Sequence, residues 1–393
     1  METAGELAPP LRILLGPGPS SVHPRVLKAL ATPLVGHLDP EFLRLMEETK
    51  DLLRFAFQTK NALTFPISGT GSAGMEACFV NLLEPGDEAI VGVNGVFGTR
   101  MKDVIERCGA TPVVMEAGWG HVFTPDQVRG ALSRCRRPKL VALVHAETST
   151  GAWQPLEEMA AIVHNAGALF VVDAVTSLGG CPVQIDAWGI DACYSGTQKC
   201  LSCPPGLSPV TFNQAAVEVI RKRKSKVQSW YLDLTMIEKY WGEERVYHHT
   251  APISMNYALR EALRLVQEEG LAARFRRHQR NHEALAAGLA DMCMSLAAQE
   301  GHRLWTLNSV TIPANVDDAA IRRQLLEEYN IEVGAGLGPL RSKVWRIGLM
   351  GESSTRSNVL LVLSALEDSL RIQGHRCTTG AGVSAAQQVY AAG

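Results

Sequence analysis

Two segments, ALFVVDAVTSLGG (residues 168–180) and DACYSGTQK (residues 191–199), decide the fold and place the candidate chemistry. In the first, an apolar run ends at the carboxylate of Asp173, and such a short run beside glycine is typical of a strand buried on both faces. In the second, residues 192–194 predict another short strand, which leads to Lys199. The carboxyl ends of strands line the ligand crevice of an open α/β sheet. We therefore expect Asp173 and Lys199 at one edge of one sheet.

An acid and an amine placed in this way suit one cofactor in particular. Pyridoxal phosphate needs a lysine for its Schiff base and an acid against its ring nitrogen, because a protonated ring is the better electron sink. Without other signals, Asp173 would be interpreted as a turn residue and Lys199 as a surface charge. The surrounding segments favour the cofactor interpretation.

Those segments also carry a family resemblance. VVDAVTSLGG and YSGTQK resemble the cofactor segments of the class V, fold-type I aminotransferases, in the alanine–glyoxylate and serine–pyruvate aminotransferase group. The resemblance implies that Asp173 is the partner of the pyridine nitrogen, Lys199 the Schiff-base lysine and Gln198 a phosphate contact. It covers about residues 14–372 and rests on five motifs in matching order.

A glycine-rich loop, residues 68–74, stands between a predicted strand and a predicted helix. Glycines let the backbone approach a phosphate, and the free amides of the helix start attract it. The loop also matches G-x-G-x-x-G, the fingerprint of dinucleotide-binding dehydrogenases, but these need an acid at the end of the next strand. That strand ends in Asn94-Gly95, so a phosphate cup is favoured. The resemblance assigns the cup to Thr70, Gly71 and Ser72, where Ser72 departs from the histidine of some relatives.

Three further positions match the family. LLGPGPS (residues 14–20) resembles its entry segment, whose glycine backbone, here Gly18, borders the substrate. Phe97 stands where relatives place an aromatic ring, often tryptophan, against the pyridine, although an aromatic residue beside glycine is more often core. Thr148 matches a hydroxyl that binds the phenolic oxygen of the cofactor. The neighbouring His145 is expected to be structural.

Two more segments complete the predicted site. Arg346 lies within an apolar strand, where a guanidinium is costly to bury without an anion, and WRIGLMG resembles the substrate-carboxylate strand of the family. A structural ion pair is the alternative for Arg346. YHHT (residues 247–250) resembles a segment that crosses from the partner subunit, which implies that Tyr247 and Thr250 bind the phosphate of the neighbouring site. The resemblance therefore implies a homodimer with shared active sites.

Composition excludes several classes of protein. The 393 residues carry a formal net charge of -2, so neither nucleic acid nor an anionic membrane is an expected partner. The basic run at residues 221–226 is expected to be a solvated loop. Nine cysteines without an even framework predict reduced thiols, and Cys200-x-x-Cys203 has no second pair for zinc. No metal site is expected.

The termini and apolar runs bear on the compartment. The start, METAGELAPP, lacks the basic and long apolar regions of a secretory signal, and no apolar run reaches the roughly 18 residues of a membrane span. The end, Tyr390-Ala-Ala-Gly393, is not a peroxisomal Ser-Lys-Leu signal. A cytoplasmic location is expected.

Alternating strands and helices predict an α/β protein with a mostly parallel sheet. The resemblance implies seven strands in a large cofactor-binding domain and a smaller C-terminal α+β domain. The expected parts are an N-terminal arm at 1–13, the large domain at 14–269, the small domain at 270–373 and a disordered tail at 374–393, whose Gly-, Ala-, Ser- and Thr-rich composition lacks an apolar stripe.

The expected function is ping-pong transamination between alanine or serine and a 2-oxo acid, with glyoxylate preferred as acceptor. Both substrates are small molecules. The alternatives are another enzyme with the same cofactor, such as an aminoethylphosphonate transaminase or a cysteine desulfurase, or an NAD-dependent dehydrogenase. A non-catalytic binding protein is the weakest alternative, because it gives no reason for this acid, lysine and arginine to occur together.

Overall fold

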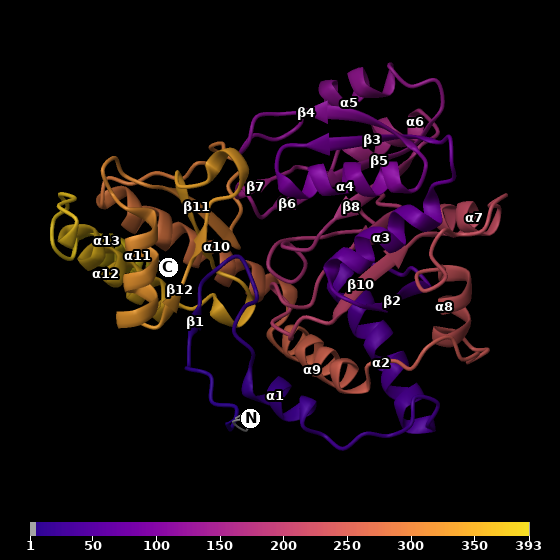
Figure 1. Ribbon diagram of the computed structural model, residues 1–393, viewed down its shortest axis with the longest axis horizontal. Coiled ribbons are helices and arrows are strands. Elements are labelled where there is room, and N and C mark those ends of the chain that lie inside the picture. The colour runs from indigo at the N-terminus through magenta and orange to yellow at the C-terminus, as the bar shows by residue number, and fades with distance from the viewer. Residues whose placement is uncertain (1–4, 393) are drawn as a thin grey trace.

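The computed structural model describes residues 5–392, and a seven-stranded sheet forms the centre of its N-terminal part (Figure 1). Within this sheet only β10 runs antiparallel to its neighbours, so the predicted mostly parallel sheet is confirmed. In spatial order the strands are β2 (Leu63–Ser68), β10 (Leu207–Phe212), β9 (Ala192–Tyr194), β8 (Leu169–Asp173), β5 (Pro138–Val144), β3 (Glu88–Val93) and β4 (Thr111–Glu116).

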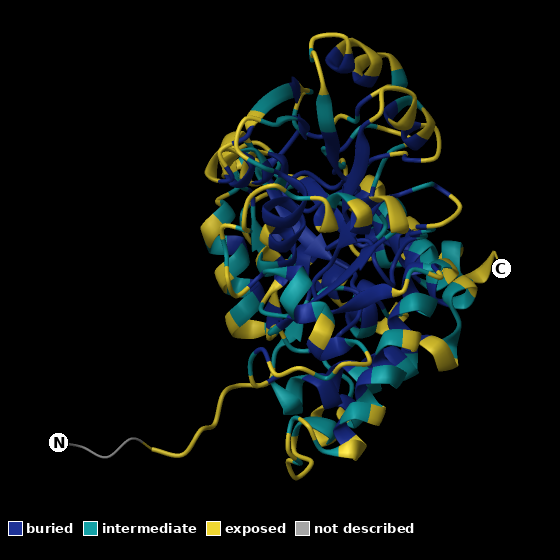
Figure 2. Cartoon of the chain, turned by 90° about the vertical axis from the view of Figure 1, so that its right-hand side faces the viewer, coloured by how far each residue is buried: buried dark blue, intermediate teal, exposed yellow. Residues whose placement is uncertain are grey.

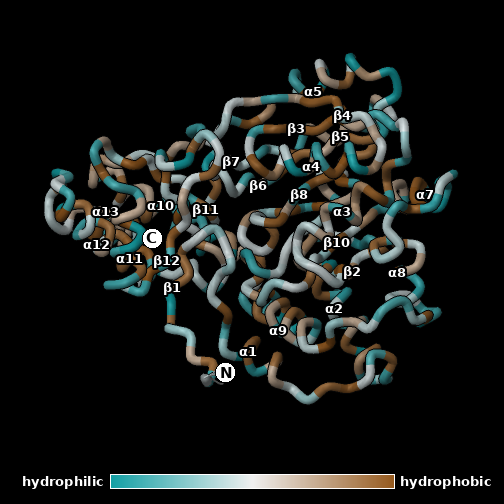
Figure 3. The backbone as a smooth tube through the Cα atoms, in the orientation of Figure 1, coloured by the Kyte–Doolittle hydropathy of each residue, from teal (hydrophilic) through white to brown (hydrophobic). Residues whose placement is uncertain are grey.

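Helices cover both faces of this sheet, which explains the apolar strands. Along β8, Phe170 and Val172 belong to one apolar cluster, while Leu169 and Val171 belong to the cluster on the other face. Figure 2 shows the strands buried at the centre, and Figure 3 shows their hydrophobic composition. The helices are α1 (Pro24–Leu30), α2 (Pro40–Phe57), α3 (Gly71–Leu82), α4 (Val96–Arg107), α5 (Pro125–Leu132), α6 (Met159–Asn165), α7 (Gln214–Arg221), α8 (Leu234–Trp241) and α9 (Ile253–Glu269).

The C-terminal part begins at α10, directly after Gly270, and has an apolar core of its own. Its small sheet has the order β11-β14-β13, with Arg346 in the central strand. The elements are α10 (Leu271–Asp291), β11 (Leu307–Thr311), α11 (Asp318–Glu328), β12 (Ile331–Glu332), β13 (Gly334–Ala335), β14 (Val344–Gly348), α12 (Arg356–Ile372), α13 (Ala381–Ala391) and the short 3-10 helices η1 (Gly338–Leu340) and η2 (Gly351–Ser353).

The N-terminal segment departs from the predicted domain limits. The strand β1 (Ile13–Leu14) pairs in parallel with β12, and Leu15 belongs to the apolar core of the C-terminal part. The chain from residue 14 therefore first packs with the C-terminal part, before it enters the large sheet. Sequence spacing gave no sign of this pairing, because the partner strands lie more than 300 residues apart.

The predicted disordered tail is wrong for most of its length. Residues 381–391 form α13, which packs against α10 and α12. The contact with α10 uses small residues: a Cβ at Gly288 would lie 2.6 Å from the carbonyl oxygen of Gly382. Gly393 and residues 1–4 of the predicted arm lie outside the described residues.

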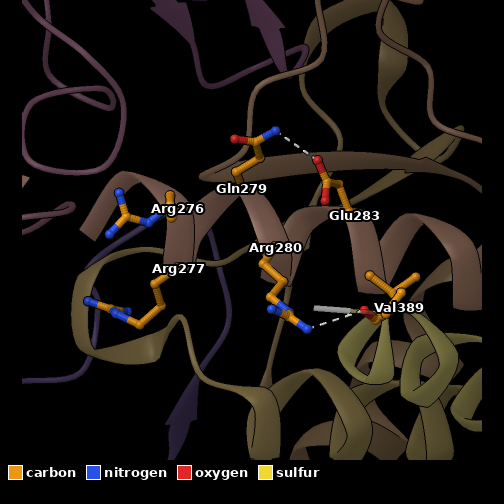
Figure 4. Close-up of a pocket in the computed structure, with 7 residues that line it drawn as sticks. Arg276, Arg277, Gln279, Arg280, Glu283 and Val389 are labelled. Atoms are coloured by element: carbon orange, nitrogen blue, oxygen red, sulfur yellow. Dashed lines mark hydrogen bonds between the residues drawn. The ribbon is translucent and has the colours of Figure 1, made fainter. Parts of the chain in front are cut away.

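Arg280 binds the C-terminal end of α13. Its guanidinium donates to the carbonyl oxygens of Tyr390 at 2.5 Å and Val389 at 3.4 Å, in a pocket that Arg276 and Arg277 also line (Figure 4). A cation at a helix C-terminus complements the exposed carbonyls. The tail is thus ordered by this charged contact, by close backbone packing and by apolar residues of α13, since Ala386 joins the C-terminal core and Val383 and Val389 pack against it.

Two short strands, β6 (Ala146–Glu147) and β7 (Ala152–Trp153), form a hairpin beside the large sheet. Across residues 5–392, no helix combines the length and apolar character needed to span a membrane.

Candidate active site

Asp173 is the last residue of β8 and is 2% exposed. Its carboxylate accepts hydrogen bonds from the Val175 amide at 2.9 Å and from the Tyr194 hydroxyl at 2.7 Å. Burial raises the pKa of Asp173 to about 7, and the nearby charge of Glu147 acts in the same direction. A cation placed against Asp173 would favour its ionised form.

Lys199 follows β9, so the acid and the amine lie at the same edge of the sheet. Its Nζ donates to the carbonyl oxygen of Pro17. Burial, followed by the positive charge of Arg346, lowers the pKa of Lys199 to about 8. A cationic amine is thereby made easier to deprotonate near neutral pH, which both a nucleophile and a base require.

Gly18 lies directly against this amine. Its φ is +102°, and a Cβ built on it would lie 2.6 Å from Lys199 Nζ. Only a residue without a side chain fits there, since the substituent would occupy the space of the lysine. The structure thus places Gly18 at the centre of the site.

Residues 70–72 form the start of α3, with Thr70 at its N-cap and no side-chain cap. Thr70 and Ser72 are exposed. The first backbone amides of an uncapped helix are available to an anion. A Cβ at Gly71 would lie 3.4 Å from Val175 and 3.6 Å from the Ser195 carbonyl oxygen, so this start abuts both cofactor segments.

Gln198 lies beside this loop. Its Oε1 is buried without a hydrogen-bond partner among the described residues, and it lies 3.0 Å from the position of a Cβ on Gly196. An unpaired buried acceptor is costly, so this oxygen suits a ligand that donates a hydrogen bond, whereas a phosphate, which only accepts, would bind the side-chain NH2 group of Gln198.

Phe97 lies in the first turn of α4, and its backbone amide donates to the Glu147 carboxylate at 3.1 Å. Glu147 is fully buried and also accepts from the amide of Ser149 at 3.0 Å and from its hydroxyl at 2.5 Å. The Arg100 guanidinium lies 5.0 Å from the Phe97 ring centroid. Glu147 therefore fixes the helix turn that carries the ring.

Arg346 is 8% exposed and donates to the Ala335 carbonyl oxygen at 2.8 Å and to the Thr148 carbonyl oxygen at 3.4 Å. Burial lowers its pKa to about 10. Within residues 5–392, Arg346 forms no salt bridge, which argues against the structural ion pair and leaves its charge for a ligand carboxylate.

Thr148 is buried, and its hydroxyl lies 2.6 Å from that of Thr176. Because a hydroxyl has one donor and two acceptor positions, the pair retains capacity for a further partner. Thr148 also connects the two parts of the chain, since its carbonyl oxygen receives the bond from Arg346.

Comparison with known proteins identifies the family. Residues 17–350 match the family model described as Aminotransferase class-V. The chain belongs to this family.

Its relatives cover nearly its whole length. The (S)-ureidoglycine–glyoxylate transaminase of Bacillus subtilis (strain 168) is 42% identical over 403 residues, which is 98% of this chain and 97% of that protein. The alanine–glyoxylate aminotransferase of Mus musculus is 41% identical over 369 residues, or 93% of this chain and 89% of that protein. Both names describe transamination with glyoxylate.

Solved structures of aminotransferases have the same fold as this chain. The crystal structure of ureidoglycine–glyoxylate aminotransferase from Bacillus subtilis superposes with a TM-score of 0.96 at 43% identity, covering 98% of this chain and all of that chain. The crystal structure of an alanine–glyoxylate aminotransferase from Nostoc sp. has a TM-score of 0.93 at 52% identity, covering 94% and 98%. The fold-type I architecture is confirmed, and the chain is an aminotransferase.

Membership of the class-V aminotransferase family implies that pyridoxal phosphate is the cofactor. The site residues of this chain fit that cofactor. The uncapped start of α3 offers backbone amides to the phosphate, the buried Asp173 suits a protonated ring nitrogen, and the Lys199 amine suits the aldehyde.

Tyr247 and Thr250 are not brought to this site by the described contacts. Both are exposed, their hydroxyls lie 3.5 Å apart, and the Tyr247 ring lies 5.1 Å from that of His37. The adjacent His249 bonds to Ser68 at 2.7 Å, so the segment passes near the end of β2. Their assignment to a neighbouring subunit stays a prediction.

His145 has both ring nitrogens occupied, by Ser177 at 2.9 Å and by the Trp153 indole at 2.8 Å. Burial lowers its pKa to about 3, so it is a neutral structural residue. Cys200 and Cys203 are buried and free. Among the described residues, no group of His, Cys, Asp and Glu side chains is arranged to hold a metal ion.

Two site residues were missed from the sequence. Tyr194, which binds Asp173, stands opposite it in the register of β8 and β9, so correct strand pairing would have found it. Glu147 carries a different signal, an acid between Ala146 and a run of hydroxyl residues directly after a buried strand. Its contact with α4 depends on tertiary structure.

Proposed function

We propose that this protein transfers the amino group of a small amino acid to glyoxylate with bound pyridoxal phosphate. The observation that carries the proposal is the convergence of three groups: a buried lysine amine, a buried acid at the next strand end and a buried arginine that forms no salt bridge with the described part of the chain. The relatives whose names describe glyoxylate transamination, at 41–42% identity, support the acceptor.

Each residue has a distinct task. When bound, pyridoxal phosphate supplies an electron sink that allows a proton to leave the substrate α-carbon. Asp173 would hold a positive ring nitrogen, and the start of α3 with Gln198 would hold the phosphate. Phe97 would pack against the ring and Thr148 would bind its phenolic oxygen.

Substrate handling falls to Arg346 and Lys199. The guanidinium of Arg346 would bind the substrate carboxylate through two parallel hydrogen bonds. Its contacts with the Ala335 and Thr148 carbonyls fix its direction. Lys199 Nζ would then take the proton from the substrate α-carbon, because its lowered pKa leaves a substantial fraction uncharged near neutral pH.

The names of the relatives suggest two classes of amino donor. Alanine or serine is the expected donor, and the 52% identical alanine–glyoxylate aminotransferase structure favours alanine. A ureidoglycine donor is the second candidate, because the Bacillus subtilis relative matches 98% of the chain.

A half-reaction screen tests the donor. Single amino acids, including alanine, serine and (S)-ureidoglycine, are added to the cofactor-loaded enzyme, and the visible absorbance of the cofactor is followed as it converts to the pyridoxamine form. Conversion by alanine or serine, followed by recovery with glyoxylate, is expected. Conversion by none of the amino acids, with cofactor bound, would refute the proposal.

We further propose a homodimer in which Tyr247 and Thr250 serve the partner's site. Their exposure and their contacts away from Lys199 support this arrangement. Hybrid dimers from a Lys199→Ala parent and a Tyr247→Phe/Thr250→Val parent contain one complete site. Activity should appear on mixing, whereas isolated hybrids no more active than the parents would show that the sites are not shared.

The compartment remains a proposal as well. All nine cysteines are free in the structure, which supports a reducing compartment such as the cytoplasm.

A further inference from the structure

Arg274, in the first turn of α10, is 1% exposed and lies under both cofactor segments. Its Nε donates to the Gly179 carbonyl oxygen at 2.7 Å, and its Nη2 donates to the Cys200 carbonyl oxygen at 2.6 Å. Gly179 lies near the end of the segment that follows Asp173, and Cys200 directly follows Lys199. One guanidinium of the C-terminal part therefore binds the backbone of both segments.

The turn that carries Lys199 is held at three consecutive carbonyls. Ser20 donates its amide to the Gln198 carbonyl at 2.9 Å and its hydroxyl to the Lys199 carbonyl at 2.7 Å, and Arg274 binds the carbonyl of Cys200. These three bonds fix the peptide planes on both sides of Lys199. Arg274 supplies the charged bond of the three, which is the stronger type.

Glu269 orients this guanidinium. Its carboxylate lies 2.6 Å from Arg274 Nη1 and 2.6 Å from Arg277 Nε. Burial alone would raise the pKa of Glu269, but the hydrogen bonds and charges of the two arginines lower it to about 2. The acid is therefore ionised near neutral pH, and the buried cation of Arg274 is compensated.

Arg277 extends the network to the loop that follows the Arg346 strand. Its Nη1 donates to the carbonyl oxygens of Gly351 at 2.9 Å and Ser354 at 2.6 Å, and its side chain points away from that of Arg280 in Figure 4. The same loop contacts the lysine turn directly, because the Glu352 amide donates to the Ser202 hydroxyl at 2.8 Å.

We propose that Arg274, oriented by Glu269, is a positioning residue that fixes the Lys199 turn to α10, so that the Lys199 amine keeps its place relative to the Arg346 guanidinium. The kinetic part of this inference rests on the proposed function. A displacement of about 1 Å in such a constellation costs on the order of 100-fold in rate.

The main test replaces Arg274 by lysine, which keeps the charge but cannot reach two carbonyls and a carboxylate in one plane. Arg280→Gln is the matched control, because it removes a partly buried contact of the same helix with α13 and leaves the Lys199 turn untouched. Thermal unfolding of both variants measures their loss of stability, so a general weakening of α10 is separated from an effect on Lys199.

The first readout needs neither cofactor nor turnover. In the cofactor-free protein, the acetylation of Lys199 by acetic anhydride is followed against pH by peptide mass spectrometry. The wild-type amine should titrate near pH 8. In Arg274→Lys the midpoint should rise by on the order of one pH unit, because a loosened turn admits water and reduces the desolvation of the amine. Arg280→Gln should leave the midpoint unchanged.

The second readout is the half-reaction of the cofactor-loaded enzyme. Arg274→Lys should lower the rate constant of the half-reaction by about 100-fold with cofactor still bound, and Arg280→Gln should retain the wild-type rate constant. If Arg274→Lys does not fold, Glu269→Gln replaces it, with a loss of about tenfold expected because the two carbonyl bonds remain.

The outcomes distinguish the two proposals. An unchanged Lys199 midpoint and rate in a folded Arg274→Lys or Glu269→Gln variant would overturn the positioning role, and so would an equal shift in Arg280→Gln. A shifted midpoint in an enzyme that converts no amino acid would support the positioning role and refute the proposed function.

Discussion

Asp173→Asn should stabilise the cofactor-free protein and cripple the loaded enzyme. The structure gives the reason, because burial moves the pKa of Asp173 from 3.8 to about 7. At pH values above 7 the folded protein must hold a buried carboxylate, which corresponds to about 4 kcal/mol of unfavourable free energy relative to the unfolded chain. Asparagine removes this cost.

The direction in which wild-type stability changes with pH follows from proton binding. Between about pH 4 and pH 7 the folded wild-type protein retains a proton on Asp173 that the unfolded chain has lost, so wild-type stability falls as the pH rises. The Asp173→Asn variant has no such dependence. The amide also leaves one buried hydrogen-bond group unmatched against the Tyr194 hydroxyl, which costs about 1–3 kcal/mol at every pH.

Denaturant unfolding of the cofactor-free proteins at pH 4 and pH 8 checks this prediction. The stability of Asp173→Asn relative to wild type should increase by up to about 4 kcal/mol between the two pH values. Cofactor loading should make the wild-type protein the more stable of the two at pH 8, because breaking a buried charged pair costs about 3–5 kcal/mol, or about 100-fold to several thousand-fold in turnover. A relative stability that is the same at both pH values would refute the reasoning.

Three further predictions concern the amine and the guanidinium. Lys199→Ala should abolish turnover while cofactor still binds without covalent attachment, and full activity would exclude the assigned role. Arg346→Lys should weaken the binding of substrates that carry a carboxylate by about tenfold or more, with unchanged cofactor absorbance, because lysine cannot form the two parallel hydrogen bonds of the guanidinium. An equal loss of affinity for an amine without a carboxylate would contradict this. The rate of cofactor capture by the free protein should rise with pH through about 8 as Lys199 loses its proton, and Arg346→Gln should shift this profile to higher pH, as stopped-flow absorbance would measure.

Local patterns were sufficient to place the centre of the site. An apolar run that ends in Asp173 and a short strand that leads to Lys199 are sequence signals, because burial on both faces requires continuous apolar residues. The loop at residues 70–72 was recognisable for the same reason, as the link between a strand and a helix. These features depend on neighbours along the chain.

Features set by distant contacts were not predictable in this way. Arg274 looks like an ordinary surface charge in the sequence, and although Glu147 follows a buried strand, only tertiary structure shows what either residue binds. The tail was misjudged because composition was taken as a measure of order, whereas α13 packs its few apolar residues against the C-terminal core and approaches α10 closely at Gly288 and Gly382. Small residues give no hydrophobic signal when they permit backbones to touch.

The pairing of β1 with β12 also has a consequence for synthesis on the ribosome. The segment that borders Lys199 through Pro17 and Gly18 is made first, but its strand partner, residues 331–332, is made about 320 residues later. At roughly 5–20 residues per second, the interval is on the order of half a minute. The large sheet can fold during this time with its lysine uncovered, and the active site closes only when the C-terminal part has emerged.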